Sequence, residues 1–327
     1  MNIDIGLFTG QVPPESDTSP TERYQAMVEL GEVADQAGFE KAWVSEHHFL
    51  DDSYIPAVQS FASALGARTS SMTIGTGIAL APFYDPIRLA ESSAVIDRLT
   101  AGRYELGLAI GWTDEEFEAF DIDKRKRVAH TKDRIEIARK AWNQDTFSHD
   151  GRLYDYSDVS VYPKPDSRIP IWIGGTVDAA VKRAATMADG YFATPTPLDE
   201  LERRQELLAE TETDPTELAE WRYTFVAEDE DPWDDVKQNI WYIKRQYIEW
   251  ATGEPQPYEL PEEQEDDLRD ECLVGSVSEV TDRLHRRRDR LGEDYRFVAR
   301  MTLPGLSAAK IENAVELFGD EIIPELR

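Results

Sequence analysis

Residues 19–49 read SPTERYQAMVELGEVADQAGFEKAWVSEHHF, and this stretch holds one complete helix followed by one strand. Ser19 and Pro20 are typical of a helix start and Gly38 of a helix end, so the pattern predicts a helix over 21–37. The β-rich run 41–45 follows at once, and a similar run, 3–8, precedes the helix. Two short strands joined through a helix indicate a parallel βαβ unit.

The same alternation continues outward to the end of the chain. Further strands are predicted at 72–77, 103–109, 171–173, 190–193, 222–226 and 295–299. Helices are predicted at 56–68, 86–99, 178–187, 198–209, 234–250, 276–291 and 308–318, and a long one ends near Trp142. Eight strands, each followed by a helix, predict an α/β fold of the (β/α)8 TIM-barrel type with insertions. A doubly wound open sheet is the alternative.

Two segments interrupt this alternation and are predicted to be insertions. Residues 148–170 lack a helical period and could form a short hairpin. Residues 253–270 are rich in proline and acidic side chains, and are either a lid over a site or a solvated loop. Apart from them, residues 1–327 are expected to form a single barrel domain. The lone Cys272 cannot form an intramolecular disulfide.

The charge balance excludes several classes of partner. The chain has 65 acidic and 35 basic side chains and a formal net charge of −30. Such a surface repels nucleic acid and anionic membranes. Only 10 of the basic residues are lysines, a balance expected of a halophilic protein, although an ordinary acidic enzyme is the alternative. Neither a signal peptide nor an apolar run of spanning length is evident, so we expect a cytoplasmic protein.

The most reactive residues in the sequence follow the second predicted strand. In a barrel, active sites are built at the carboxyl ends of the strands, where Glu46, His47 and His48 would lie. Adjacent residues of an extended chain point to opposite sides, so the two histidines are not expected to share a metal ion. One histidine would face the barrel mouth and transfer protons. The alternative is a pair of hydrogen-bonded histidines at the rim.

Two glycine-containing turns are further candidates. Gly174-Gly175-Thr176 joins a strand to a helix, and backbone amides at such a turn can bind a phosphate, although glycine there can serve geometry alone. Gly75-Thr76-Gly77 permits a close backbone approach or an unusual peptide geometry, and a simple bulge is the alternative. Ile243, Tyr247 and Trp250 have the spacing of a buried helix face, and we expect them to be core.

Taken in order, these motifs resemble the bacterial luciferase-like family of flavin- or deazaflavin-dependent oxidoreductases. The matching runs are AGFEKAWVSEHHF (37–49), IGTGIALAPFYDP (74–86), DRLTAGRYELGLAIGW (97–112) with Glu116-Phe117, PIWIGG (170–175), ADG (188–190) and LVGSVSEVTDRL (273–284). The resemblance covers nearly all of the chain.

The resemblance implies roles for particular residues around a cofactor at the barrel mouth. His47 would be the histidine that handles protons near the reactive face of the flavin. Gly77-Ile78 would be a non-prolyl cis peptide that supports the ring system. Gly174-Gly175-Thr176 would hold the cofactor phosphate, and Arg127 would be a second contact for that anion. No metal ion is expected.

The resemblance also implies the reaction. The leading hypothesis is a flavin-dependent monooxygenase that takes reduced FMN from a flavin reductase and oxidises a small organic substrate with O2. Ile110 and Gly175 replace an Arg and a Glu of the luciferase subunits, and the run 107–112 is closer to members that use F420. F420-dependent hydride transfer without oxygen therefore stays open, as does a flavin-binding protein without catalysis. A homodimer is implied by the resemblance, and no motif identifies the substrate.

Overall fold

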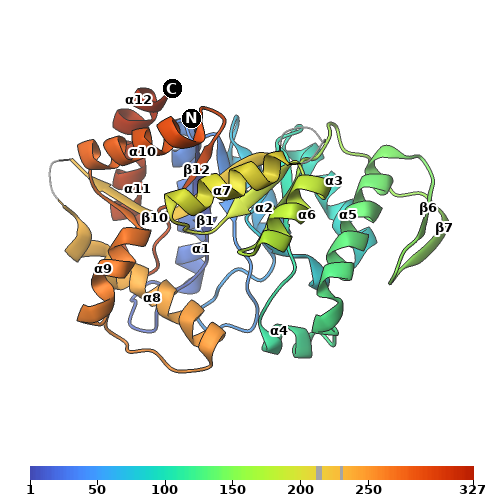
Figure 1. Ribbon diagram of the computed structural model, residues 1–327, viewed down its shortest axis with the longest axis horizontal. Helices are drawn as coiled ribbons and strands as arrows, with labels where there is room; N and C mark the ends of the chain where they lie inside the picture. The colour runs from blue at the N-terminus through green and yellow to red at the C-terminus, as the bar shows by residue number, and fades with distance from the viewer. Residues whose placement is uncertain (211–215, 229–230) are drawn as a thin grey trace.

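A computed structural model describes residues 1–210, 216–228 and 231–327, and contains a closed barrel of eight parallel strands (Figure 1). In order around the ring, the strands are β1 (Asn2–Phe8), β2 (Lys41–Val44), β3 (Thr73–Thr76), β5 (Tyr104–Ala109), β8 (Ile171–Gly174), β9 (Gly190–Ala193), β10 (Glu217–Ala227) and β12 (Arg296–Arg300). Pairing of β12 with both β10 and β1 closes the ring. The predicted barrel is confirmed and the open sheet is wrong.

Helices surround the barrel between successive strands. They are α1 (Pro20–Gln36), α2 (Val58–Arg68), α3 (Pro86–Leu99), α5 (Arg127–Asn143), α6 (Asp178–Met187), α7 (Leu198–Ala209), α8 (Trp233–Thr252), α10 (Val277–Leu291) and α11 (Ala308–Leu317). Shorter pieces are η1 (Ala81–Phe83), α4 (Asp114–Ala119), η2 (Lys124–Lys126), η3 (Phe318–Ile322) and α12 (Ile323–Leu326). A reciprocal capping box between Ser19 and Glu22 starts α1. Within the ranges described, no helix combines the length and apolar content needed to cross a membrane.

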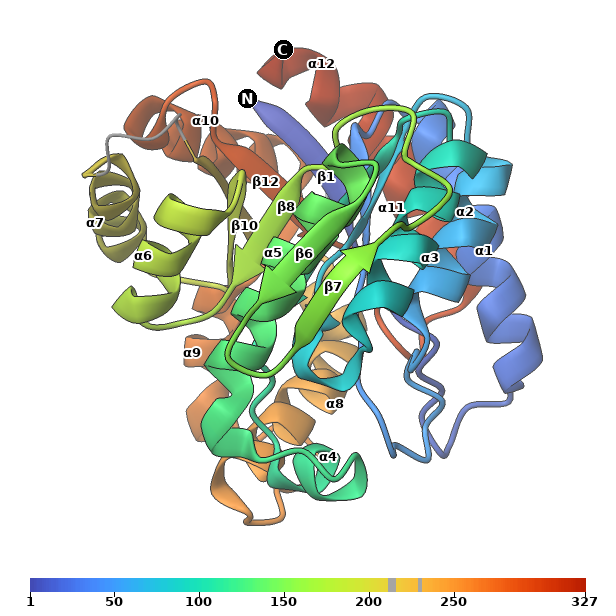
Figure 2. The ribbon, with the colours of Figure 1, turned by 90° about the vertical axis from the view of Figure 1, so that its right-hand side faces the viewer.

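The two predicted insertions differ in outcome. Strands β6 (Phe147–Asp150) and β7 (Asp155–Val159) form an antiparallel hairpin over the 148–170 segment, which Figure 2 shows in front of the barrel. The 253–270 segment is not irregular throughout, because α9 (Glu262–Glu271) occupies its second half. Acidic residues in the first turn of α9 favour a helix start, and its Leu268 is buried against the core.

Two short strands were not predicted, and one predicted strand is longer than expected. β4 (Ala79–Leu80) pairs with β5, and β11 (Leu273–Ser276) pairs with the end of β10 outside the ring. β10 begins at Glu217 rather than at residue 222. Its charged residues Glu220 and Arg222 are buried and form an ion pair of 2.7 Å. This pairing allows the strand to begin in a polar stretch that the sequence pattern does not predict to be a strand.

Buried polar side chains fill the amino-terminal end of the barrel. The indole of Trp43 donates a hydrogen bond of 2.8 Å to Asp4, and Lys41 forms a 2.7 Å ion pair with Glu105. Arg296 pairs with Asp4 at 2.7 Å. Each charge is matched, so this end is closed by a satisfied network and the open space of the barrel lies at the carboxyl ends of the strands.

Candidate active site

A cavity of about 640 Å³ lies at the carboxyl ends of the barrel strands. Figures 1 and 2 show α4 and α8 at this end of the molecule, away from the two chain termini. Every residue predicted to act at the site lines this one cavity: His47, Gly77, Ile78, Arg127, Gly174, Gly175 and Thr176. The structure thus brings the predicted residues together, while their individual roles stay predictions.

His47 is held by a carboxylate and by aromatic rings. Its Nδ1 lies 3.3 Å from Oε1 of Glu116 in α4, and the same oxygen accepts the backbone N–H of His48 at 3.0 Å. Burial would raise the pKa of Glu116, but hydrogen bonds from His47, Thr113 and His48 lower it overall. An anionic partner orients the imidazole, an arrangement suited to proton transfer.

The neighbouring side chains Glu46 and His48 form hydrogen bonds that hold the loop after β2 in place. His48 Nε2 lies 2.9 Å from Oε1 of Glu46, and its ring packs against Phe83 and Phe120 rather than into the cavity. The other oxygen of Glu46 accepts the backbone N–H of Leu80 at 2.7 Å. The two histidines therefore occupy different surroundings, as predicted.

Two arginines lie at the end of the cavity formed by the Gly174-Gly175-Thr176 turn. Arg127 donates to the carbonyl of Gly111 at 2.9 Å, and Arg183 of α6 also lines the cavity. Nη1 of Arg183 is buried and has no hydrogen-bond partner in the part of the chain that the structure describes. Burial lowers the pKa of Arg183, and repulsion from Arg127 lowers it further. Two adjacent cations beside a glycine turn fit the phosphate of a flavin-type cofactor.

The wall between this end and His47 is built around Ile78. The Gly77-Ile78 peptide is cis, as the family resemblance implies, and a second non-prolyl cis peptide, Gly6-Leu7, was not expected. Ile78 packs so closely on β8 that a Cβ at Gly174 would lie 2.6 Å from its Cδ1. The apolar side chain is thereby fixed on the cavity wall, where a flat ring system can rest on it.

Sequence reasoning missed several residues that line this cavity or contact His47 beside it. Tyr247 and Trp250 were expected to be core, but their rings lie 5.6 Å and 4.8 Å from that of His47. Helical spacing shows that residues share one face of a helix. It does not distinguish an aromatic residue that faces a cavity from one that is buried in the core, so the sequence could not separate the two. Glu116 stood in a matching motif without a role, and Arg183 resembled an ordinary solvated cation of an outer helix.

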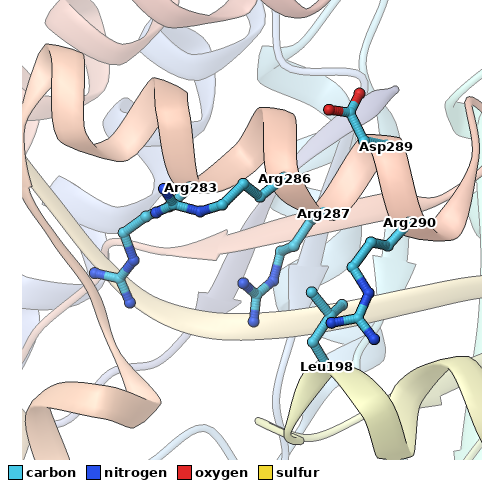
Figure 3. Close-up of a pocket in the computed structure, with 6 residues that line it drawn as sticks. All are labelled: Leu198, Arg283, Arg286, Arg287, Asp289 and Arg290. Carbon is cyan, nitrogen blue, oxygen red and sulfur yellow. The ribbon is translucent and has the colours of Figure 1, made fainter.

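A second cavity, of about 380 Å³, lies outside the barrel and contains none of the predicted residues. It is lined by Leu198, Arg283, Arg286, Arg287, Asp289 and Arg290. Figure 3 shows the four arginines projecting from α10. Arg287 pairs with the buried Glu220 at 3.2 Å, and Arg290 pairs with Asp199 and Glu202 of α7. We therefore place the candidate active site in the barrel cavity.

Comparison with known proteins identifies the family. The profile of the luciferase-like monooxygenase family matches residues 3–294. The chain belongs to this family. The oxygenase component of a flavin-dependent trigonelline monooxygenase from Acinetobacter baylyi is 23% identical over 98% of this chain and 94% of its own length. An F420-dependent glucose-6-phosphate dehydrogenase from Nakamurella multipartita is 24% identical over 92% of both chains.

A solved structure gives the same fold. The crystal structure of the monooxygenase RslO1 from Streptomyces bottropensis superposes with a TM-score of 0.88 at 23% identity, with full coverage of both chains. This similarity confirms the barrel architecture. Members of the luciferase-like family include both flavin-dependent and F420-dependent enzymes, and the chain is an oxidoreductase of this family.

Proposed function

We propose that the protein is a flavin-dependent monooxygenase that oxidises a small organic substrate with O2 and takes reduced FMN from a separate reductase. The observation that carries this proposal is that His47, which contacts Glu116, lines the same cavity as the cation-flanked glycine turn. When bound, the reduced flavin supplies the electrons that activate O2. One enclosed space would then hold the cofactor, the substrate and a group that transfers protons.

The chain's own residues divide this work between the two ends of the cavity. Gly174-Gly175-Thr176, Arg127 and Arg183 would bind the cofactor phosphate, and Ile78 would support its ring. His47, held by Glu116, would give or take a proton at the reacting atoms. The aromatic side chains around His47 would limit the entry of water, which strengthens the electrostatic interactions within the site.

F420-dependent hydride transfer is the second candidate, and Ile110 favours it. This apolar residue lines the cavity at a position where the luciferase subunits have a phosphate-binding arginine. Titration of the apoprotein with FMN and with F420, in oxidised and reduced forms, separates the two functions. Tight F420 binding without FMN binding, and no substrate-dependent O2 consumption, would overturn the monooxygenase proposal.

A substitution at His47 tests whether the protein is an enzyme rather than a flavin-binding protein. We expect His47→Ala to lower turnover about 10²- to 10⁴-fold, the usual contribution of a positioned acid or base. Cofactor affinity should be unchanged, because His47 lies away from the phosphate-binding turn. The measurements are steady-state turnover and a cofactor titration, with His285→Ala on α10 as the control. Equal losses of turnover and of cofactor affinity would contradict the assigned role.

We also infer that the chain forms a single barrel domain and a homodimer, and both inferences are supported by the family resemblance. The charge balance supports a cytoplasmic enzyme adapted to concentrated salt.

The 253–270 segment would serve as a lid. It packs along α8, where the indole of Trp241 donates to the carbonyl of Pro257 at 3.0 Å, and α8 supplies Tyr247 and Ala251 to the cavity. Protection of this segment from proteolysis by bound cofactor would support the lid.

A further inference from the structure

Arg300, the last residue of β12, is a buried cation that forms no ion pair with the described part of the chain. Its side chain is fully buried, and its Nε, Nη1 and Nη2 have no hydrogen-bond partner among the residues that the structure describes. Arg134, which is nearly as buried, instead donates to the carbonyls of Tyr84 and Pro82 and to the hydroxyl of Tyr154. An ionised group is seldom buried unpaired, so the position of Arg300 requires an explanation.

Aromatic residues separate Arg300 from the cavity. Its guanidinium lies 5.0 Å from the ring centre of Trp221 and 5.1 Å from that of Tyr223. Both residues also line the cavity, as do Tyr54 and Tyr247. Arg300 is thus one layer of side chains behind the cavity wall, and the rings in that layer border open space on their other side.

Two tyrosine hydroxyls and a serine hydroxyl lie in a row in this layer. The hydroxyl of Tyr54 lies 2.8 Å from that of Ser45 and 3.4 Å from that of Tyr247. Burial opposes the charge of Arg300, but Tyr223, Tyr54 and Tyr247 raise its pKa overall. The acid on this side of the cavity, Glu271, is paired with Lys244 at 2.6 Å and does not neutralise Arg300.

We propose that Arg300 and the tyrosine hydroxyls in front of it form a subsite for a carboxylate, and that the substrate is a small organic monocarboxylic acid. A tyrosine hydroxyl in this layer can donate its proton to a carboxylate oxygen, and the nearby guanidinium offsets the negative charge of that carboxylate. One guanidinium balances one negative charge, which favours a carboxylate over a doubly charged phosphate. The inference rests on the proposed function, since it names the substrate class of the same cavity.

The proposed carboxylate subsite lies on a different side of the cavity from the residues proposed to bind the cofactor phosphate. Arg127 and Arg183 lie beside the turn after β8, whereas Arg300 ends β12 and is covered by Trp221 and Tyr223 of β10. The barrel strands β8 and β12 are separated by β9 and β10 in the sheet. A phosphorylated cofactor and a carboxylate substrate would therefore meet their cations on different sides of the cavity.

Binding of benzoate and of its neutral isostere benzamide tests the subsite without turnover. Quenching of tryptophan fluorescence, or calorimetry, would be followed at a fixed high salt concentration. We expect benzoate to bind more tightly by about tenfold, the difference expected between a charge-assisted and a neutral hydrogen bond. Equal binding of the two probes, or no saturable binding of benzoate, would overturn the proposal.

Variants test whether the preference for benzoate over benzamide depends on Arg300. Arg300→Met should bring the two affinities together by weakening benzoate alone, whereas the control Arg286→Met, on the exposed side of α10, should leave the preference intact. If Arg300→Met does not fold, Tyr247→Phe keeps the ring and should weaken benzoate several-fold and benzamide less, because the hydrogen bond that benzamide loses is a neutral one. A preference that survives in the folded variant would refute the subsite. Failure of O2 consumption would refute the monooxygenase proposal without affecting these binding results.

Discussion

Arg183 is a half-buried cation, and its buried Nη1 has no hydrogen-bond partner among the described residues, so an anion would satisfy it. Replacement by Met should weaken binding of the phosphorylated cofactor about 10- to 100-fold, because a hydrogen bond to a charged group contributes about 1.5–3 kcal/mol. The free protein should be as stable as wild type or more so, since Arg127 repels this charge. Cofactor titration and thermal unfolding would check both expectations.

Arg286→Met is the matched control for Arg183→Met, because Arg286 is exposed on α10 and does not line the barrel cavity. Its loss should change neither cofactor affinity nor unfolding temperature by a measurable amount. If the two variants bind the cofactor equally well, Arg183 is not a phosphate contact.

The residues predicted from sequence were those whose position follows from the end of a strand. His47 lies three residues after the end of β2 and Gly174 is the last residue of β8, so both are expected at the barrel mouth, where active sites of barrels are built. Glu116 and Arg183 lie on helices, and only the tertiary structure shows that Glu116 contacts His47 and that Arg183 lines the cavity. Arg300 could not be predicted to be buried, because a charged residue at a strand end is normally solvated.

At the scale of elements, hydrogen bonds to Asp35 connect the end of α1 to the turn before β3. Its carboxylate accepts the backbone N–H groups of Ser70 and Met72 at 2.6 and 2.7 Å and the hydroxyl of Ser71 at 2.5 Å. Partial burial would raise the pKa of Asp35, but these hydrogen bonds lower it to about 2. A depressed pKa means that the ionised carboxylate stabilises the folded state.

Asp35→Asn should therefore lower the free energy of unfolding at pH 7 by about 1–2 kcal/mol, after allowance for solvent screening. The stabilisation is fully present above the unfolded pKa of about 3.9 and is lost as pH falls toward 2. Chemical unfolding at pH 7 and near pH 3 would show the difference shrinking. The exposed Asp17→Asn controls for the loss of one negative charge, and a difference that does not depend on pH would contradict the assignment.

The sequence predicted all eight barrel strands because each is a short apolar or β-branched run between helix signals. It failed where a strand or helix is mainly polar. β10 begins with Glu217 and includes the buried Glu220, whose charge is matched by Arg222 and Arg287. β11 contains Gly275 and Ser276, which resemble a helix cap, and Ser276 does cap α10. Whether such a polar segment forms a strand is decided by residues distant in sequence that pair with it.

At the scale of the whole molecule, the net charge of −30 predicts that stability depends on salt. Several carboxylates of α9 are exposed, including Glu262, Glu263, Asp266 and Asp267. Raising KCl from about 0.1 M to 1 M shortens the screening length from about 10 Å to about 3 Å and should weaken this repulsion. We expect the unfolding temperature to rise by several degrees, whereas sucrose of equal osmolarity should have a smaller effect. An unfolding temperature that is indifferent to KCl would contradict the prediction.

The pairing of β11 with β10 has a consequence for how this enzyme can change. Residues 224–227 of β10 pair with 273–276 of β11, so the described residues between them, 228 and 231–272, form an excursion that starts at β10 and ends at the strand next to it, about 4.8 Å away. That excursion supplies Lys244, Tyr247, Ala251 and Glu271 to the cavity, while the phosphate-binding residues come from other parts of the chain. This excursion could therefore be exchanged, in evolution or by design, as one continuous piece of sequence. Such an exchange would change the substrate-facing residues and leave the phosphate-binding residues unaltered.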